Sequence, residues 1–354
     1  MQLPKAGAAM RTRMASRALS SAIGARTILR VGGVPEHFNT PWHTAAKKGL
    51  FEQAGLTVLW NDFPGGTGAM MGALNSNEID VALALTEGIV SDMHNPKNLG
   101  STQLLGTYVS SPLTWGVHVA SGSDITSIHQ LDDERRRTRY AVSRMGSGSH
   151  LMACVGAHAR GRDPAQLQYA LVGGLDGARV ALREGNAEAF LWERYTTQPC
   201  VDNGEFRRIG EVPTPWPCFS IAASSGIVER QGPALLAMLD VVRGEATRLA
   251  KSPDAARTIA GMCGLEEAEV REWMAGVRWA CAPEISHTML SKVMETLVEA
   301  GVLQRDELRP AASLVSSITQ NADDARRRGP LEFSLPANDQ QPPSKHRDTV
   351  YTQV

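Results

Sequence analysis

Several classes of protein are excluded by what this 354-residue sequence has little of. Its five cysteines are an odd number without CxxC spacing, so neither a disulfide framework nor a zinc site is expected. No uncharged apolar run approaches the roughly 20 residues that span a bilayer. The formal net charge of −1 gives the whole chain no attraction to nucleic acid or to an anionic membrane. We therefore expect a globular protein with no bound metal, no nucleic-acid partner and no membrane insertion.

Acidic residues are also missing from the first 35 positions, which contain six basic ones: Lys5, Arg11, Arg13, Arg17, Arg26 and Arg30. An acid-free leader with Arg, Ser and Ala is typical of a transit peptide. We assign residues 1–27 to such a peptide and expect an organelle location, the mitochondrion rather than the plastid. A disordered basic tail is the alternative. Residues 326–354 are rich in Pro, Gln, Asp and Ser, and we expect them to be disordered.

An internal repeat predicts the architecture. From Ile28 to Leu85 the pattern reads strand, helix, strand, helix, strand, with a helix start at Thr40 and a Gly65-Gly66 turn. One constant shift along the sequence places Thr40 on Gly148 and Gly65-Gly66 on Gly173-Gly174. This alternation indicates mostly parallel sheets with crossover helices. We therefore predict an α/β protein of two similar lobes, with residues 28–113 and 220–325 in lobe one and 114–219 in lobe two.

The loops that follow the strands supply the predicted site, because ligands of open parallel sheets bind beyond the carboxyl ends of the strands. The candidate ligand-binding residues in these loops and in the segments between the lobes are Glu36, His37, Phe38, Asn39, Gly65, Gly66, Thr67, Thr86, Glu87, Ser111, Ser143, Arg144, Gly146, Ser147, Gly148, Ser149, His150, Trp192, Glu193, Tyr195 and Trp216.

These residues predict a ligand with two chemically different ends. The Ser143–His150 loop offers backbone N–H groups at a helix start, with Arg144, and is expected to bind an anionic group; a flexible turn is the alternative. Trp192, together with Glu36 and Glu87, suits a flat group that carries an amino function or a positive charge. For Trp42, at the start of the first helix, a binding role and simple packing are equally open.

Five segments together resemble a known family: PEHFNTPWH at 35–43, PGGTGAM at 64–70, EIDVALALTEG at 78–88, SRMGSGSH at 143–150 and WERYTT at 192–197. The family is the type II periplasmic-binding-protein-like group, which includes nitrate, sulfonate and taurine substrate-binding proteins and the thiamine-pyrimidine synthases. The chain is most similar to a fungal and algal subgroup of stand-alone members. The resemblance covers about residues 28 to 320 and implies a Venus-flytrap fold that binds a small ligand between its lobes.

The synthase branch, as the resemblance implies, uses a lysine-bound pyridoxal phosphate and a histidine. The lysine position falls on Ala84 and the histidine position on Gly88. Of the synthase's cysteine-rich run, Cys218-Phe219 remains. We therefore expect no cofactor.

The function predicted from the sequence is binding of a small organic ligand in the interlobe cleft, by a solute-binding, carrier or sensor protein. A thiamine precursor or an amino- or sulfonate-like compound is the expected ligand, and a permease partner is left open. No catalytic residue is assigned. The alternative is an enzyme of the thiamine-pyrimidine synthase-like type that acts on a small heterocycle. In a more general form of this alternative, the cleft closes on a substrate and Glu36, His37 or His150 acts as general acid or base.

Overall fold

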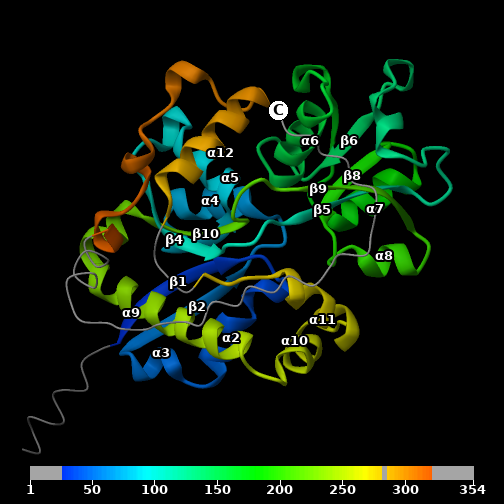
Figure 1. Ribbon diagram of the computed structural model, residues 1–354. Coiled ribbons are helices and arrows are strands. Elements are labelled where there is room, and N and C mark those ends of the chain that lie inside the picture. Colours follow the sequence, from blue (N-terminus) through cyan, green and yellow to red (C-terminus); the bar gives the residue numbers. More distant parts are fainter. Residues whose placement is uncertain (1–25, 281–284, 321–354) are drawn as a thin grey trace, which may run out of the picture.

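Apolar runs form the central strands of two separate sheets. The structure, a computed structural model, describes residues 26–280 and 285–320; most of the predicted leader and the whole predicted tail lie outside the described residues. Within these residues each sheet has five strands, in the orders β2-β1-β3-β10-β4 and β7-β6-β8-β5-β9 (Figure 1). The first sheet contains β1 (Thr27–Gly33), β2 (Leu56–Asp62), β3 (Val81–Leu85), β4 (Thr102–Val109) and β10 (Phe219–Ser224). The second contains β5 (Thr114–Ala120), β6 (Arg139–Val142), β7 (Gln168–Leu171), β8 (Ala189–Glu193) and β9 (Phe206–Pro213).

One strand in each sheet runs against the other four. β10 is antiparallel to both of its neighbours, β3 and β4, and β5 is antiparallel to β8 and β9. The remaining pairings, β1 with β2 and β3, and β6 with β7 and β8, are parallel. Each antiparallel strand is the first one after the chain has passed from the other sheet. The prediction of an α/β fold with mostly parallel sheets is therefore confirmed.

The predicted repeat is visible in the boundaries of the elements. The shift that places Thr40 on Gly148 also places both ends of β3 on those of β8, and both ends of α4 (Thr67–Asn75) on those of α7 (Leu175–Arg183). Helices α2 (Thr40–Lys47) and α6 (Gly148–Ala159) start with the same offset. The two sheet orders also correspond strand for strand. We call the first sheet with its helices lobe one and the second sheet with its helices lobe two.

The helices of lobe one cover both faces of its sheet (Figure 1). On one side lie α2, α3 (Leu50–Gln53) and α9 (Ser225–Ala250), and on the other lie α4, α5 (Thr86–Met93) and α12 (His287–Glu299). The pair α10 (Ala255–Cys263) and α11 (Glu267–Gly276) follows α9, and α8 (Gln198–Asp202) belongs to lobe two. Serine side chains cap several of these helices: Ser147, Ser224 and Ser286 accept hydrogen bonds from backbone N–H groups of the first turns of α6, α9 and α12.

Two short crossovers connect the lobes, at residues 110–113 and 214–218, and they are hydrogen-bonded to each other. The Leu113 N–H donates to Thr214 Oγ1 at 2.9 Å, and the Thr214 N–H donates to the Leu113 carbonyl, also at 2.9 Å. The Cys218 N–H donates to the Ser111 carbonyl at 3.1 Å. Three hydrogen bonds therefore join the two crossovers.

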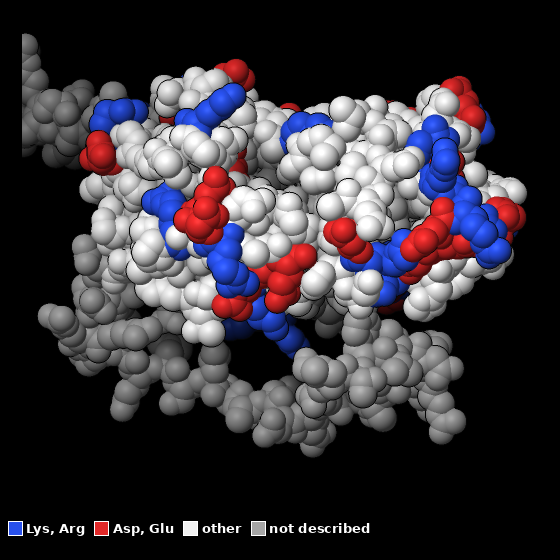
Figure 2. Space-filling model, turned by 90° about the horizontal axis from the view of Figure 1, so that it is seen from above, with Lys and Arg blue, Asp and Glu red and all other residues white. Residues whose placement is uncertain are grey.

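Charged side chains of both signs lie next to each other on the face drawn in Figure 2. Many form ion pairs, such as Arg136 with Asp124 at 2.8 Å and Arg160 with Asp132 at 2.8 Å. No helix among the described residues is long and apolar enough to cross a membrane.

Candidate functional site

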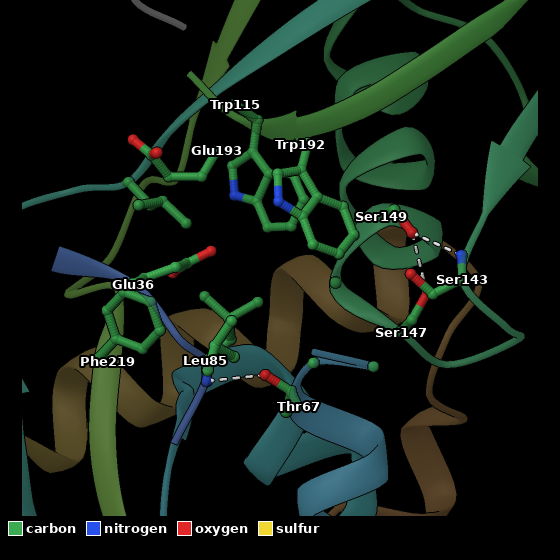
Figure 3. A pocket seen from close by; sticks show the side chains of 15 residues that line it. Glu36, Thr67, Leu85, Trp115, Ser143, Ser147, Ser149, Trp192, Glu193 and Phe219 are labelled. Carbon is green, nitrogen blue, oxygen red and sulfur yellow. Dashed lines mark hydrogen bonds between the residues drawn. The ribbon is translucent and has the colours of Figure 1, made fainter. Parts of the chain in front are cut away.

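A cavity lies between the lobes, where the ends of their strands face one another (Figure 3). It contains about 420 Å³ of space free of protein atoms, part of which is open to solvent. Its lining residues are Val34, Glu36, Gly65, Gly66, Thr67, Leu85 and Phe219 from lobe one, Leu113 from a crossover, and Trp115, Ser143, Ser147, Gly148, Ser149, Trp192 and Glu193 from lobe two. Ten of the predicted site residues are among them.

Two helix N-termini, one from each lobe, meet at this cavity. Helix α4 begins at Thr67 after a Gly65-Gly66 turn, in which Gly66 takes a left-handed φ of 72°. Helix α6 begins at Gly148 after Ser147. The first N–H groups of a helix have no partner within the helix, and the helix dipole places partial positive charge there. The cavity therefore has a place for an anionic group between the lobes.

The serine hydroxyls beside α6 hold the loop in shape. Ser149 Oγ accepts from the Ser143 N–H at 3.0 Å and lies 3.0 Å from Ser147 Oγ. On the other lobe, Thr67 Oγ1 accepts from the Leu85 N–H at 3.0 Å. These hydroxyls fix the ends of the loops, so that the backbone N–H groups are already oriented before a ligand arrives.

Aromatic rings form the wall on the other side of the cavity. Trp115 is at the start of β5, Trp192 is in β8, and Phe219 is at the start of β10. The two indole rings lie edge to face, with centroids 6.4 Å apart. Leu85 and Leu113 complete the apolar lining. The flat rings suit a flat or apolar ligand body.

Two carboxyl groups line the cavity, but only one is free to meet a ligand. Glu193 Oε2 accepts from the Thr196 N–H at 2.7 Å and from Thr196 Oγ1 at 2.8 Å. The Glu36 carboxyl has no hydrogen-bond partner among the described residues and points into the cavity (Figure 3). Burial, with a smaller contribution from the charge of Glu193, raises the pKa of Glu36 to about 8. Near neutral pH Glu36 is therefore largely protonated.

The structure places His37, Phe38 and Asn39 away from the cavity. His37 and Phe38 pack against Trp273 of α11, with ring centroids 4.3 and 5.0 Å apart. Burial lowers the pKa of His37 to about 3, so this imidazole is neutral. Asn39 Nδ2 donates to the Val34 carbonyl at 2.7 Å and holds the loop after β1. The short 3₁₀ turn at His37–Asn39 turns these side chains toward α11 and leaves Glu36 as the cavity residue of this loop.

Four further predicted residues hold the crossovers and do not line the cavity. The Trp216 indole N–H donates to Glu87 Oε2 at 2.7 Å, and burial raises the pKa of Glu87 to about 7. Thr86 Oγ1 donates to the Pro217 carbonyl at 2.7 Å. Ser111 Oγ accepts from the Arg278 N–H at 3.2 Å. The expected pairing of Glu87 with a ligand is thus replaced by pairing with the crossover.

Arg144, Gly146, His150 and Tyr195 also lie outside the lining. Arg144 Nη1 donates to the Gly65 carbonyl at 2.9 Å, so its guanidinium bridges the two lobes instead of pointing into the cavity. His150 Nδ1 accepts from the Gly146 N–H at 3.1 Å, which fixes the ring beside its own loop. The Arg194 guanidinium lies over the Tyr195 ring, 5.2 Å from its centroid.

Trp42 packs in lobe one and is 1% exposed, with its ring 5.9 Å from those of Phe51 and Trp60. The structure thus favours simple packing for this residue.

The two positions that correspond to synthase residues are also packed against their neighbours. Ala84 is fully buried in β3. A Cβ atom on Gly88 would overlap Thr67 Cγ2, so α5 approaches α4 too closely for any side chain there. Among residues 26–280 and 285–320 no three His, Cys, Asp or Glu side chains are grouped to hold a metal.

Known proteins with this arrangement identify its family. The family described as Ca3427-like PBP matches residues 115–212. The solved structure of the conserved Candida albicans CA3427 gene product, described as defining a family with the generic periplasmic binding protein fold, is 30% identical to this chain. The alignment covers 82% of this chain and 96% of that one, with a TM-score of 0.74. This chain belongs to the Ca3427-like family.

Solved structures with lower identity share the fold of the Ca3427-like family. The alkanesulfonate-binding protein SsuA from Xanthomonas axonopodis pv. citri, bound to MOPS, is 17% identical over 83% of this chain and 99% of its own, with a TM-score of 0.68. The nitrate-binding protein NrtA from Synechocystis PCC 6803 is 13% identical over 86% and 89%, with a TM-score of 0.64. No curated protein matches the chain in sequence. The predicted type II periplasmic-binding-protein fold is confirmed.

Proposed function

We propose that this protein binds a small organic acid, a sulfonate or carboxylate with a flat apolar body, in the cavity between its lobes, and that it acts as a solute-binding, carrier or sensor protein. The observation that carries the proposal is the meeting of two helix N-termini, α4 and α6, at one cavity from opposite lobes. An anionic group placed there contacts both lobes and favours their closed arrangement.

The lining supports this class of ligand. Apart from the N–H groups, the wall is made of Trp115, Trp192, Phe219 and two leucines, which favour an apolar body. SsuA from Xanthomonas and NrtA, named above for alkanesulfonate and nitrate binding, have the same fold. The thiamine-precursor ligand implied by the sequence resemblance stays a prediction.

The synthase alternative finds no support in the cavity. Ala84 and Gly88 stand at the two positions that the synthase needs. Of the three proposed acid–base residues, His37 and His150 are turned away from the cavity, and the pKa of each is lowered by burial. Glu36 lines the cavity. We therefore do not propose turnover.

The test begins with native mass spectrometry of the purified protein, to identify any small molecule that co-purifies. Calorimetry then compares benzenesulfonate with benzenesulfonamide, a neutral compound of nearly the same shape. We expect the anion to bind and the amide to bind at least tenfold more weakly, because the helix N-termini favour negative charge. Equal affinity for the two compounds would contradict an anion site.

A further inference from the structure

One side chain in the cavity wall has a buried polar atom without a partner. Trp115 is 3% exposed, and its indole Nε1 has no hydrogen bond. Among the described residues that line the cavity, it is the only side chain with a fully buried nitrogen or oxygen in this condition. A buried donor that loses water without gaining an acceptor costs roughly 1–3 kcal/mol. A ligand that accepts from this N–H group recovers that free energy.

The position of the Trp115 ring is fixed by its surroundings. Its backbone pairs with Glu193 on β8 and with Val212 on β9. Gly148 lies against the ring so closely that a Cβ atom there would be 2.7 Å from Trp115 Cη2. Trp192 packs on it edge to face. The direction of the indole N–H group is therefore fixed before binding, and a ligand must place its acceptor atom along that direction.

The neighbouring carboxyl groups differ in what they can accept. Glu193 Oε2 already accepts two hydrogen bonds from Thr196. The Glu36 side chain reaches the same cavity from lobe one without a partner among the described residues, and its carboxyl points inward (Figure 3). The cavity wall thus contains a fixed donor on lobe two and an acceptor on lobe one.

We propose that the ligand carries, at the end opposite its acidic group, a planar group with a hydrogen-bond acceptor beside an N–H donor, of the carboxamide or amino-heteroarene class. The acceptor receives the Trp115 N–H, and the ligand N–H donates to Glu36. This inference rests on the proposed function for the position of the acidic group. It adds the chemistry of the second end.

Three probes test the two ends separately: benzenesulfonate, benzamide and 4-carbamoylbenzenesulfonate. In calorimetry we expect the carbamoyl sulfonate to bind about tenfold more tightly than benzenesulfonate, as one or two good hydrogen bonds provide. The Trp115→Phe variant keeps a ring but loses the N–H group. It should remove that advantage, so that affinity for the carbamoyl sulfonate falls about tenfold more than affinity for benzenesulfonate. Trp192→Phe, which also replaces an indole of the same wall, is the matched control and should preserve the advantage.

The outcomes separate this inference from the proposed function. Equal binding of benzenesulfonate and its carbamoyl derivative overturns the inference alone, and so does an equal loss for both probes in Trp115→Phe. Binding of benzamide that depends on Trp115, without binding of either sulfonate, overturns the anion site and supports the inference. Binding of none of the three overturns both.

A second measurement on the wild-type protein avoids any folding defect of the variant. In ¹⁵N-labelled protein, the indole N–H resonance of Trp115 should shift downfield with 4-carbamoylbenzenesulfonate, because the N–H group becomes hydrogen-bonded. It should shift little with benzenesulfonate. An unchanged Trp115 indole resonance in the presence of bound carbamoyl probe would overturn the proposal.

Discussion

The two lobes have the same strand order, yet they use equivalent loops differently. Glu36 in lobe one and Arg144 in lobe two occupy equivalent positions of the repeat: Glu36 follows β1, Arg144 follows the corresponding strand β6, and each precedes a helix N-terminus. Glu36 points into the cavity without a side-chain partner among the described residues, whereas Arg144 extends across to the Gly65 carbonyl of the other lobe. One loop thus offers a group to the ligand, and its counterpart holds the lobes together. We call the loop after β1, which contains Glu36, the recognition side, and the Ser143–His150 loop, which contains Arg144 and Gly148, the closure side.

The loops after β3 and β8 differ in a similar way. In lobe one Glu87 accepts from the Trp216 indole of the crossover. In lobe two Arg194 pairs with Glu211 at 3.2 Å and with Glu272 of α11 at 3.4 Å, across the cleft. Lobe one therefore anchors the crossover, while lobe two contributes the contacts that form when the lobes meet. The following variants test this division, from the largest expected effect to the smallest.

The strongest disturbance of the closure side is Gly148→Val. A Cβ atom at this position would lie 2.5 Å from Leu85 Cδ1 of the other lobe and 2.7 Å from Trp115 Cη2. We expect benzenesulfonate affinity to fall at least a hundredfold, because the lobes cannot approach. Calorimetry measures the loss. Gly72→Val places the same side chain on a helix with nothing within 4 Å and should bind like the wild type; wild-type affinity in Gly148→Val would contradict our account of closure.

The recognition side makes stability depend on pH through Glu36. The pKa of this carboxyl is about 8 in the folded chain and near 4.5 in the unfolded one. Between those values the unfolded chain releases a proton that the folded chain keeps. The free energy of unfolding therefore falls as the pH rises from about 4.5 to 8.

Glu36→Gln should flatten this dependence. We expect urea denaturation at pH 5 and pH 8 to differ by about 2 kcal/mol less in the variant than in the wild type. The exposed Glu295 supplies the control, since Glu295→Gln should leave the difference unchanged. The same pH dependence in Glu36→Gln and wild type would show that Glu36 is not the group responsible.

Arg144→Ala removes the hydrogen bond that bridges the lobes. We expect benzenesulfonate affinity to drop about tenfold and small-angle scattering to show a larger radius of gyration, because the bridge to Gly65 favours the closed form. Gly68→Ala should act in the same direction, since a Cβ atom there would overlap Arg144 Nη2. An unchanged radius of gyration in both variants would show that the Arg144–Gly65 hydrogen bond does not favour the closed form.

The His158–Glu299 contact at the rim, which is an ion pair only when the histidine is protonated, is expected to matter least. His158 of α6 and Glu299 of α12 lie 3.6 Å apart, and both side chains are about half exposed. Such pairs contribute roughly 0–1 kcal/mol and are screened by salt. We expect His158→Ala to change affinity less than twofold, and the change to vanish in concentrated NaCl. A tenfold loss of affinity in His158→Ala would show that the His158–Glu299 pair, and not only Arg144, stabilises the closed form.

The sequence predicted the fold and the loops of the site better than the side chains that line the cavity. The repeat could be found because strands, turns and helix starts recur with one offset, as β3 and β8 do. Trp115 and Phe219 were missed for a physical reason. They begin the two antiparallel strands, β5 and β10, and the start of an antiparallel strand lies at the same edge as the carboxyl ends of its parallel neighbours. A search restricted to loops after parallel strands passes over them.

The errors within the predicted loops have a different origin. His37 is adjacent to Glu36, but it turns toward Trp273, which belongs to a helix made long after lobe two in the sequence. Trp216 was expected in the wall, but its N–H group donates to Oε2 of the buried Glu87. Which neighbour in a loop faces the cavity depends on such distant partners, and periodicity carries no signal of them.

The placement of β10 also determines the order in which the chain can complete its parts during synthesis. All strands of lobe two come from the continuous segment between Thr114 and Pro213, so the sheet can assemble once that segment has left the ribosome. The sheet of lobe one needs β10 between β3 and β4, and β10 is made only after lobe two. Until Ser224 has emerged, β3 and β4 each expose an unpaired edge. During this interval the newly made chain has a complete lobe two and an incomplete sheet in lobe one. The exposed edges of β3 and β4 then favour aggregation and binding by a chaperone.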